Sequence, residues 1–318
     1  MEDLWPIIAS VLGVALVMVA GALCRKLHWL TAQADRSLAS LTANVLLPAL
    51  FFDRVLTSPR LDSLADSWLP PLIGFLVTAI GFGVAALFAY GFGPAIGLVT
   101  PEQRRPFVLC VGICNYGYVP LPLAMQFFPE AEVTLIIHNV GVDLALWSLG
   151  VMIISGRLQG QWRRALLSPP LIAVVLALVL KQLGAAEWFP IPLAHAAESL
   201  GRCSIPMGLL LSGAIIVDFF KQIKWHEGKR VTGLAIVLRL LLLPLGMLAF
   251  ARYAELATDM QQVLLLQAAM PAATFPIVLV RLYDQDINTA LKVVLGTSVV
   301  SLLTIPLWLW AGGTWLGV

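Results

Sequence analysis

Long apolar segments follow one another along almost the entire chain, and this feature constrains the fold more than any other. A transmembrane helix needs about 20 predominantly apolar residues. Hydrophobic residues make up 59% of the 318 residues and charged residues only 12%. No soluble domain buries so much apolar surface, so the lipid bilayer must be the solvent of this chain. We expect membrane-spanning segments at residues 5–24, 37–56, 67–93, 105–128, 132–156, 165–183, 198–218, 230–252, 259–282 and 290–313.

Ten such segments predict an all-α integral membrane protein, and the charges between them predict its orientation. Glu2 and Asp3 precede the first segment, and Arg25 and Lys26 follow it. A signal peptide has the reverse order, so we interpret this segment as a retained span. Basic residues favour the cytoplasmic side, and they gather after segments one, five and seven, whereas the alternate loops are mainly acidic. Both termini are therefore predicted to lie on the outer side.

Two segments are interrupted where a membrane helix should continue. Residues 110–126 read CVGICNYGYVPLPLAMQ, and residues 268–278 read AAMPAATFPIV. Proline lacks an N–H group and clashes with the preceding turn, and Gly117 frees the chain to bend. Irregular backbone survives at membrane depth only when it is buried in protein or lines a wet cavity. The two breaks are therefore predicted to cross at mid-membrane and form a site.

The two halves of the chain resemble each other in the order of their breaks. Five segments precede the basic loop at residues 157–164 and five follow it, and an odd number inverts the second half. Pro48 is expected to interrupt segment two and Pro206 segment seven, as the breaks interrupt segments four and nine. Matched breaks are typical of inverted-repeat transporters, although proline is also common in membrane helices. We expect a first five-helix repeat at residues 1–156, a short cytoplasmic loop at 157–164 and a second, inverted repeat at 165–318.

A small polar substrate site is expected where the two breaks meet. Helix N-termini carry partial positive charge and favour an anion such as a carboxylate. Asn115 precedes the first break, and its amide offers a donor and an acceptor to a ligand; the alternative is a local helix cap. The other candidates for lining the site are Gly117, Pro120, Pro122, Gln267, Pro271, Thr274, Pro276 and Asn44.

Three ionisable side chains inside the segments are candidates for coupling or charge recognition. Asp143 is the only charge inside segment five and Arg239 the only one inside segment eight. Intramembrane charges are costly and usually functional. Two explanations stay open: the two residues pair structurally, or Asp143 takes a coupling proton while Arg239 attracts an anion. His138 titrates near neutral pH when unperturbed, and the alternative for it is an ordinary interfacial histidine.

Motifs of catalysis are not recognisable in the sequence. It has no Gly-rich phosphate loop with Lys, no His-Glu-x-x-His and no serine nucleophile elbow. An enzyme and an ATP-driven pump are therefore not expected. Cys110 and Cys114 share a helix face, but no His or acidic residue is close, so we interpret them as packing residues and not as a metal site. A net charge of +2 does not indicate a nucleic-acid partner, and no cofactor is expected beyond a coupling proton or sodium ion.

Several stretches resemble the auxin efflux carrier family, which shares its fold with bile acid:sodium symporters. The resemblance rests on LTANVLLPALFF, GICNYGYVPLPL, NVGVDLALWSLGV, RLLLLPLGM and AAMPAATFPIVLVRLYDQD with VVLGTSVVSLLTIPL, in family order over nearly the whole chain. Asn115 matches the family's asparagine. Thr274, Phe275 and Pro276 depart from the family, in which small or polar residues are common there. The short loop at 157–164 is similar to that of the compact bacterial type.

This resemblance implies a secondary transporter for a small organic anion such as malate, malonate or an auxin-like carboxylate. It implies alternating access around the crossed helices four and nine, with segments one, two, six and seven as the supporting bundle. It also implies a homodimer in a bacterial inner membrane. A proton gradient, a sodium gradient and the membrane potential are alternative energy sources. The rival hypothesis is a membrane-embedded sensor or channel-like protein that uses the same fold without coupled transport.

Overall fold

Apolar helices form nearly all of the structure. The computed structural model describes residues 4–58, 68–157, 166–185, 188–220 and 228–318. Charged residues of the expected loops at 59–67, 158–165 and 221–227 lie outside the described residues. Within these described residues, seven helices are long and apolar enough to cross a membrane: Leu4–Lys26, Ala32–Thr57, Leu69–Gly91, Pro129–Ser155, Ile191–Phe219, Lys229–Tyr253 and Ile287–Leu316.

Helix boundaries follow the apolar segments predicted from the sequence. The uninterrupted long helices are α1 (Leu4–Lys26), α4 (Leu69–Gly91), α12 (Ile191–Phe220) and α17 (Ile287–Leu316). Three further pairs are continuous through a π-helical turn: α2 (Ala32–Leu41) with α3 (Leu47–Thr57), α8 (Glu132–Ala145) with α9 (Val151–Ser155), and α13 (Lys229–Val237) with α14 (Leu243–Tyr253). The shorter helices are α5 (Gly93–Ile96) and α11 (Pro169–Gln182).

Two of the expected segments are each divided into two short helices. Residues 113–119 separate α6 (Pro101–Gly112) from α7 (Pro120–Phe127). Residues 270–275 separate α15 (Thr258–Ala269) from α16 (Pro276–Leu282). The two breaks predicted from the sequence are therefore confirmed.

The expectation that Pro48 and Pro206 interrupt their segments was wrong. Pro206 lies inside the continuous helix α12, and Pro48 follows the π-helical turn Thr42–Leu46 within a continuous helical segment. A single proline removes only one N–H donor. The wider π-helical turn before Pro48 accommodates the missing bond there without unwinding the helix. Membrane helices also tolerate a single proline such as Pro206 when neighbouring groups satisfy the freed backbone.

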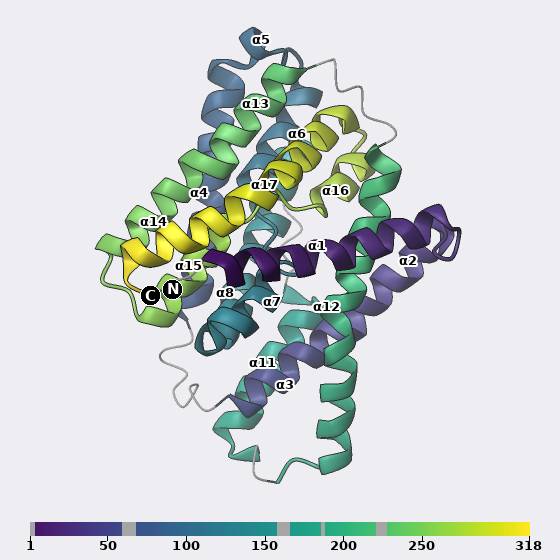
Figure 1. Cartoon of the computed structure of the whole chain (residues 1–318), viewed down its shortest axis with the longest axis vertical. Helices are drawn as coiled ribbons and strands as arrows, with labels where there is room; N and C mark the ends of the chain where they lie inside the picture. Colours follow the sequence, from purple (N-terminus) through teal and green to yellow (C-terminus); the bar gives the residue numbers. More distant parts are fainter. Residues whose placement is uncertain (1–3, 59–67, 158–165, 186–187, 221–227) are drawn as a thin grey trace.

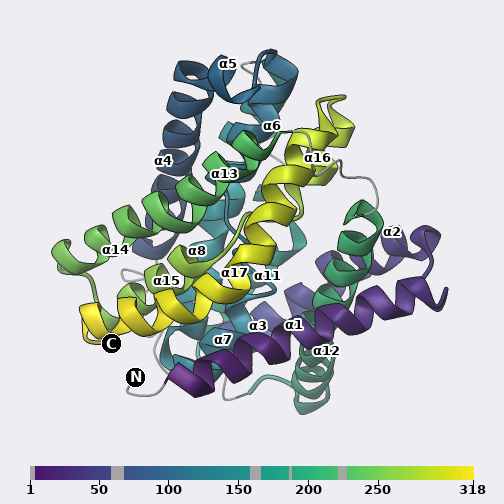
Figure 2. The same cartoon turned by 45° about the horizontal axis from the view of Figure 1, so that its top comes forward.

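The helices are arranged in two groups that meet along α1 and α17 (Figures 1 and 2). In the supporting bundle, α12 packs against α1 and α3, and α11 packs against α3. In the crossing bundle, α4 packs against α6 and α8, α15 packs against α14 and α17, and α13 packs against α17. The ion pair of Arg54 with Glu132, at 3.1 Å between Nε and Oε1, joins the supporting helix α3 to the crossing helix α8.

Glycine allows the closest helix approaches within each group. A Cβ atom added at Gly213 of α12 would lie 1.8 Å from the carbonyl oxygen of Met18 in α1. A Cβ atom added at Gly141 of α8 would lie 1.7 Å from the carbonyl oxygen of Pro71 in α4. Small residues at such contacts let membrane helices pack by van der Waals attraction, because lipid gives no hydrophobic driving force between helices.

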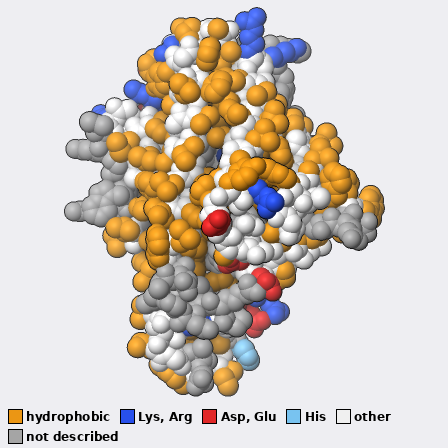
Figure 3. All heavy atoms as spheres, turned by 90° about the vertical axis from the view of Figure 1, so that its left-hand side faces the viewer, with side chains coloured by type: hydrophobic (Ala, Val, Ile, Leu, Met, Phe, Trp, Pro, Cys, Tyr) orange, Lys and Arg blue, Asp and Glu red, His pale blue; other side chains and the backbone are white. Residues whose placement is uncertain are grey.

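The outer surface of the molecule is largely apolar, as lipid contact requires. Figure 3 shows hydrophobic side chains over most of the described surface on one side, with several Lys and Arg side chains at its upper end and a few beside Asp and Glu lower down. Trp5, Leu16, Ile80 and Leu303 are among many large apolar side chains that are more than half exposed. A water-soluble monomer rarely exposes patches of this extent.

Candidate functional site

The two helix breaks contact each other through their backbones. Cys114 and Ala272 form an isolated antiparallel β-bridge. The backbone N–H of Asn115 donates to the carbonyl of Pro271 at 2.8 Å, and that of Ala273 donates to the carbonyl of Ile113 at 3.1 Å. Each break thus satisfies backbone groups that the other left unpaired by unwinding. Mutual pairing explains how two unwound stretches persist among apolar helices.

Prolines set where the helices resume after the breaks. Pro120 begins α7 and Pro276 begins α16. Proline suits the first helical position because the N–H that it lacks has no intrahelical acceptor there. Both side chains are buried. Of the predicted site residues, these two therefore shape the backbone and do not line the cavities described below.

A network of buried amides holds the first break against α8 and α15. The Gln267 side chain is fully buried and its Nε2 donates to Asn139 Oδ1 at 3.1 Å and to the Tyr116 carbonyl at 3.3 Å. Asn139 Nδ2 donates to the same Tyr116 carbonyl at 2.7 Å, and the Cys114 thiol donates to Gln267 Oε1 at 2.8 Å. Fully partnered buried amides of this kind fix a single arrangement.

Arg239 anchors the second break. Its side chain is 3% exposed, and it donates from Nε to the carbonyl of Met270 at 3.1 Å and from Nη2 to the carbonyl of Gln267 at 3.2 Å. These carbonyls end α15, where the helix dipole presents partial negative charge. Arg239 and Asp143 do not contact each other, so the structure does not show the direct ion pair that the sequence left open.

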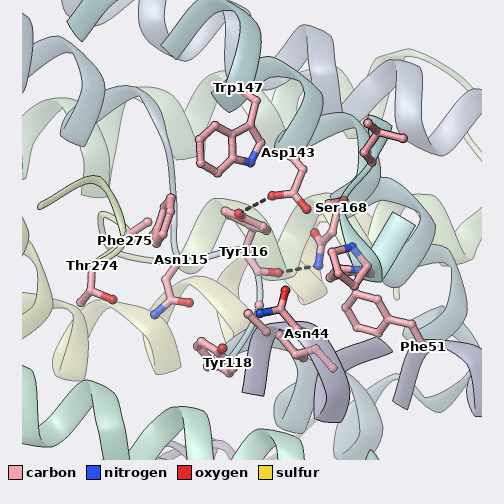
Figure 4. A pocket seen from close by; sticks show the side chains of 18 residues that line it. Asn44, Phe51, Asn115, Tyr116, Tyr118, Asp143, Trp147, Ser168, Thr274 and Phe275 are labelled. Atoms are coloured by element: carbon pink, nitrogen blue, oxygen red, sulfur yellow. Dashed lines mark hydrogen bonds between the residues drawn. The ribbon is translucent and has the colours of Figure 1, made fainter. Parts of the chain in front are cut away.

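A cavity of about 580 Å³ lies beside the crossing, and we call it the central cavity. Asp143 faces it and accepts a hydrogen bond of 2.6 Å from the Tyr116 hydroxyl (Figure 4). Trp147 packs edge-on against Phe275, with ring centroids 5.9 Å apart. Tyr118 and Phe51 complete an aromatic lining. The cavity thus combines apolar ring faces with one carboxylate and a few amide and hydroxyl groups.

The crossing separates the central cavity from a second cavity of about 440 Å³. Asn115 and Thr274 line both cavities, whereas Pro271 lines only the second. Helices α1, α12 and α17 supply most of the remaining wall. Two side chains of the breaks can therefore reach a ligand from either side of the crossing.

The predicted site residues are distributed over several places. Those that line the central cavity are Asn44, Asn115, Gly117, Asp143 and Thr274. Gln267, Arg239 and His138 line another cavity, between α4 and α14, and Pro122 lines a shallow one beside α1 and α12. Asn44 donates from Nδ2 to Ser40 Oγ in its own helix at 2.9 Å, which leaves its amide oxygen for the cavity.

His138, for which the sequence left a titrating group and an interfacial histidine as explanations, is buried within the protein. Its side chain is 1% exposed, deep between α8 and α4. The close approach of these helices at Gly74 and Gly141 encloses the ring. The position of His138 near the end of an apolar segment did not predict its burial, because burial at that position depends on how closely the neighbouring helix packs.

Sequence analysis missed several residues of the central cavity. Tyr116 and Tyr118 lie within the first break, and Trp147 follows Asp143 by one helical turn. Their positions next to predicted site residues could therefore have identified them. Asn139 precedes Asp143 by one turn on the same face of α8. Ser168, at the start of α11, carried no signal because only the fold brings it to the cavity.

Comparisons with known proteins match the chain over nearly its whole length. A family model described as membrane transport protein matches residues 6–161 and again residues 158–309. An "Uncharacterized transporter" of Methanothermobacter thermautotrophicus is 26% identical over 307 residues, which cover 94% of this chain and 96% of the relative. "Uncharacterized transporter MJ1031" of Methanocaldococcus jannaschii is 22% identical over 306 residues, 94% and 97% of the two chains. "Protein ECM3" of Saccharomyces cerevisiae is 24% identical over 161 residues, 49% of this chain and 25% of that protein.

Proposed function

Because the chain belongs to the membrane transport protein family, that of the auxin efflux carriers, we propose that it is a secondary active transporter for a small organic anion. The substrate would be a carboxylate such as malate, malonate or an auxin-like acid. Transport would proceed by alternating access, with the crossing bundle moving against the supporting bundle.

The architecture of this proposal is ten spans in an inverted five-plus-five repeat. Seven long helices, the shorter α11 and the two broken pairs supply ten segments, and the twofold match of the family model supports two related halves. The proposal places both termini on the outer side of a bacterial inner membrane and the two breaks at mid-membrane. It also includes a homodimer, which the family resemblance implies.

One observation carries the proposal: the paired breaks lie between two cavities and share residues with both. Asn115 and Thr274 belong to non-helical backbone and line the central and the second cavity. A transporter needs a site that each side of the membrane reaches in turn. A ligand bound by Asn115 at the crossing would meet this requirement, because the same side chain lines both cavities.

Asp143 supports coupling to protons. An anion entering the central cavity meets the carboxylate that the Tyr116 hydroxyl holds at 2.6 Å. Like charges at close range in a low-dielectric site repel strongly. Protonation of Asp143 removes this repulsion, so an anion and a proton would occupy the cavity together.

A second candidate substrate, an organic cation, is favoured by the same lining. Among the described residues that line the central cavity, Asp143 is the only charged one, and five aromatic side chains surround the space. Aromatic faces and a carboxylate together attract ammonium groups. An aromatic amine would then take the position proposed for the aromatic acid.

Uptake by purified protein in proteoliposomes tests the function. Indole acetate and tryptamine carry the same ring with opposite charge, so the pair reports charge selectivity directly; malate and malonate test the need for a ring. We expect saturable uptake of the acids, stimulated by an imposed pH gradient and reduced roughly tenfold or more by Asn115→Ala, since each lost charge-assisted hydrogen bond costs about 1.5–3 kcal/mol.

Other outcomes change the proposal in defined ways. Uptake of tryptamine but of none of the acids would show that the substrate is an organic cation and not an organic anion. Saturable uptake unchanged in Asn115→Ala would remove Asn115 from the site. No uptake of any probe by folded protein would favour a sensor, and uptake that does not saturate would favour a channel-like protein.

A further inference from the structure

The cavity between α4 and α14 lies on the opposite side of the amide network from the central cavity, and we call it the side groove. Its volume is about 440 Å³, within the range of small-molecule sites. Its rim is formed by Leu76 and Ile80 of α4 and by Leu242 and Phe250, before and within α14, all of them 42–61% exposed. In a membrane these side chains contact lipid, so the groove opens toward the bilayer.

The floor of the side groove is polar and carries positive charge. Arg239, Gln267 and His138 lie there, each at most 3% exposed. Two of the five N–H groups of Arg239 donate to carbonyls of the second break, and no carboxylate pairs with it in the described part of the chain. A buried charge without a counter-ion is costly, and the helix dipole compensates only part of it.

His138 supplies, at the same place, a buried polar atom without a partner in the described part of the chain. Its Nε2 atom is buried and has no hydrogen-bond partner among the described residues, while Nδ1 lies 3.5 Å from Asn139 Oδ1. Buried polar atoms are nearly always partnered, so one without a partner requires an explanation. A ligand oxygen in the groove would supply the partner.

We propose that the side groove binds a single-chain fatty acid from the bilayer. Arg239 would supply the complementary positive charge, N–H groups of Arg239 and His138 would donate to the two carboxylate oxygens, and the acyl chain would lie between α4 and α14 among the exposed rim residues. An ordinary phospholipid is less suited, because its phosphate belongs at the membrane surface and the polar floor is deep in the groove. The site is distinct from the central cavity and does not depend on the proposed transport.

Two glycines offer a matched pair of variants. Gly246 lines the groove and Gly83 on α4 does not; an added Cβ at either would have no heavy atom within 4 Å. Gly246→Leu would therefore place its Cβ in open space and add apolar volume to the groove, and Gly83→Leu would add the same side chain at an exposed position of α4 outside the groove. Neither residue belongs to the proposed transport site.

Photo-crosslinking in proteoliposomes tests the proposal, with a diazirine analogue of palmitate and its methyl ester as probes. We expect the acid to label peptides of α4 and α14, at least tenfold less in Gly246→Leu, and equally in Gly83→Leu and the unmodified protein. The ester, which lacks the charge, should label severalfold less. His138→Phe should also lower labelling by the acid, while Arg239 still holds α15.

Three results would overturn the proposal: equal labelling by acid and ester, labelling unchanged in both Gly246→Leu and His138→Phe, or labelling displaced by phosphatidylglycerol and not by unlabelled palmitate. The first two would indicate ordinary lipid contact and the third a phospholipid site. Thermal unfolding midpoints of the variants establish that each is folded before labelling is compared. No uptake measurement enters this test, so it is independent of the proposed function.

Discussion

The central cavity and the side groove lie on opposite sides of one amide network and carry opposite charges. Asp143 faces the central cavity and uses the Tyr116 hydroxyl as its partner. Arg239 lies at the side groove and uses backbone carbonyls as partners. The two charges were equally conspicuous in the sequence. Arg239 donates to the backbone that forms the crossing, whereas Asp143 faces the central cavity and accepts from a side chain.

The largest effect is expected from Arg239→Met, which would remove the hydrogen bonds from Arg239 to the backbone of the second break. The change leaves buried carbonyls at the end of α15 without their charged donor, and such a loss costs about 1–3 kcal/mol for each unsatisfied group. We expect the thermal unfolding midpoint in detergent to fall by several degrees and uptake to be lost. Arg239→Lys should recover part of the stability, because it retains the charge.

Arg252→Gln, an exposed position on the same helix pair, is the matched control and should leave the midpoint unchanged. An unfolding midpoint for Arg239→Met within one degree of the unmodified protein, together with lost uptake, would move Arg239 from the structural role to ligand binding.

A smaller effect of a different kind is expected from Asp143→Asn. The amide resembles the protonated acid, so repulsion of an anion disappears; we expect indole acetate to bind roughly tenfold more tightly and uptake to lose its response to a pH gradient. Isothermal titration and gradient-driven uptake measure the two effects separately. Tyr116→Phe, which removes only the hydroxyl, is the control that should keep a gradient response.

The sign of the Asp143→Asn effect also decides between the two substrate candidates. If the protein carries organic cations, the same variant should weaken tryptamine binding and leave indole acetate unbound. A gradient response that persists in Asp143→Asn would show that the coupling proton, if there is one, binds elsewhere.

The smallest effect is expected from Trp147→Ala, which tests the aromatic lining of the central cavity. Edge-on aromatic contacts contribute about 0.5–1.5 kcal/mol, so we expect a two- to tenfold weaker affinity for indole acetate and little change for malate. Competition binding measures both. Trp29→Ala, at a side chain that is 79% exposed, should change neither; an equal loss for malate would indicate a general disturbance of the cavity.

Much of the fold was predictable because apolar length and paired prolines are local signals. The breaks after Gly112 and Ala269 were predicted from proline and glycine, yet the same reasoning failed for Pro206. The difference lies outside the helix: residues 113–115 and 271–273 have each other's backbone as partner, whereas α12 has no such second break beside it. A single chain segment does not reveal that distinction.

The candidate site was predictable only where a side chain stands out in an apolar segment. Asn115, Asp143 and Arg239 did so, but the partners of Arg239 are main-chain carbonyls, which every residue possesses and no sequence pattern marks. Ser168 and Phe51 reach the central cavity from the other bundle. Long-range placement of this kind is decided by packing and not by periodicity.

The pairing of the breaks through main-chain atoms has a consequence for how such a protein diversifies. The bonds between Asn115 and Pro271 and between Ala273 and Ile113 involve only N–H and C=O groups. Substitutions at Asn115, Thr274 or Phe275 can therefore change the lining of the central cavity while the backbone bonds that hold the crossing are kept. New solute preferences are accessible to this architecture one side chain at a time, without a loss of foldability in between.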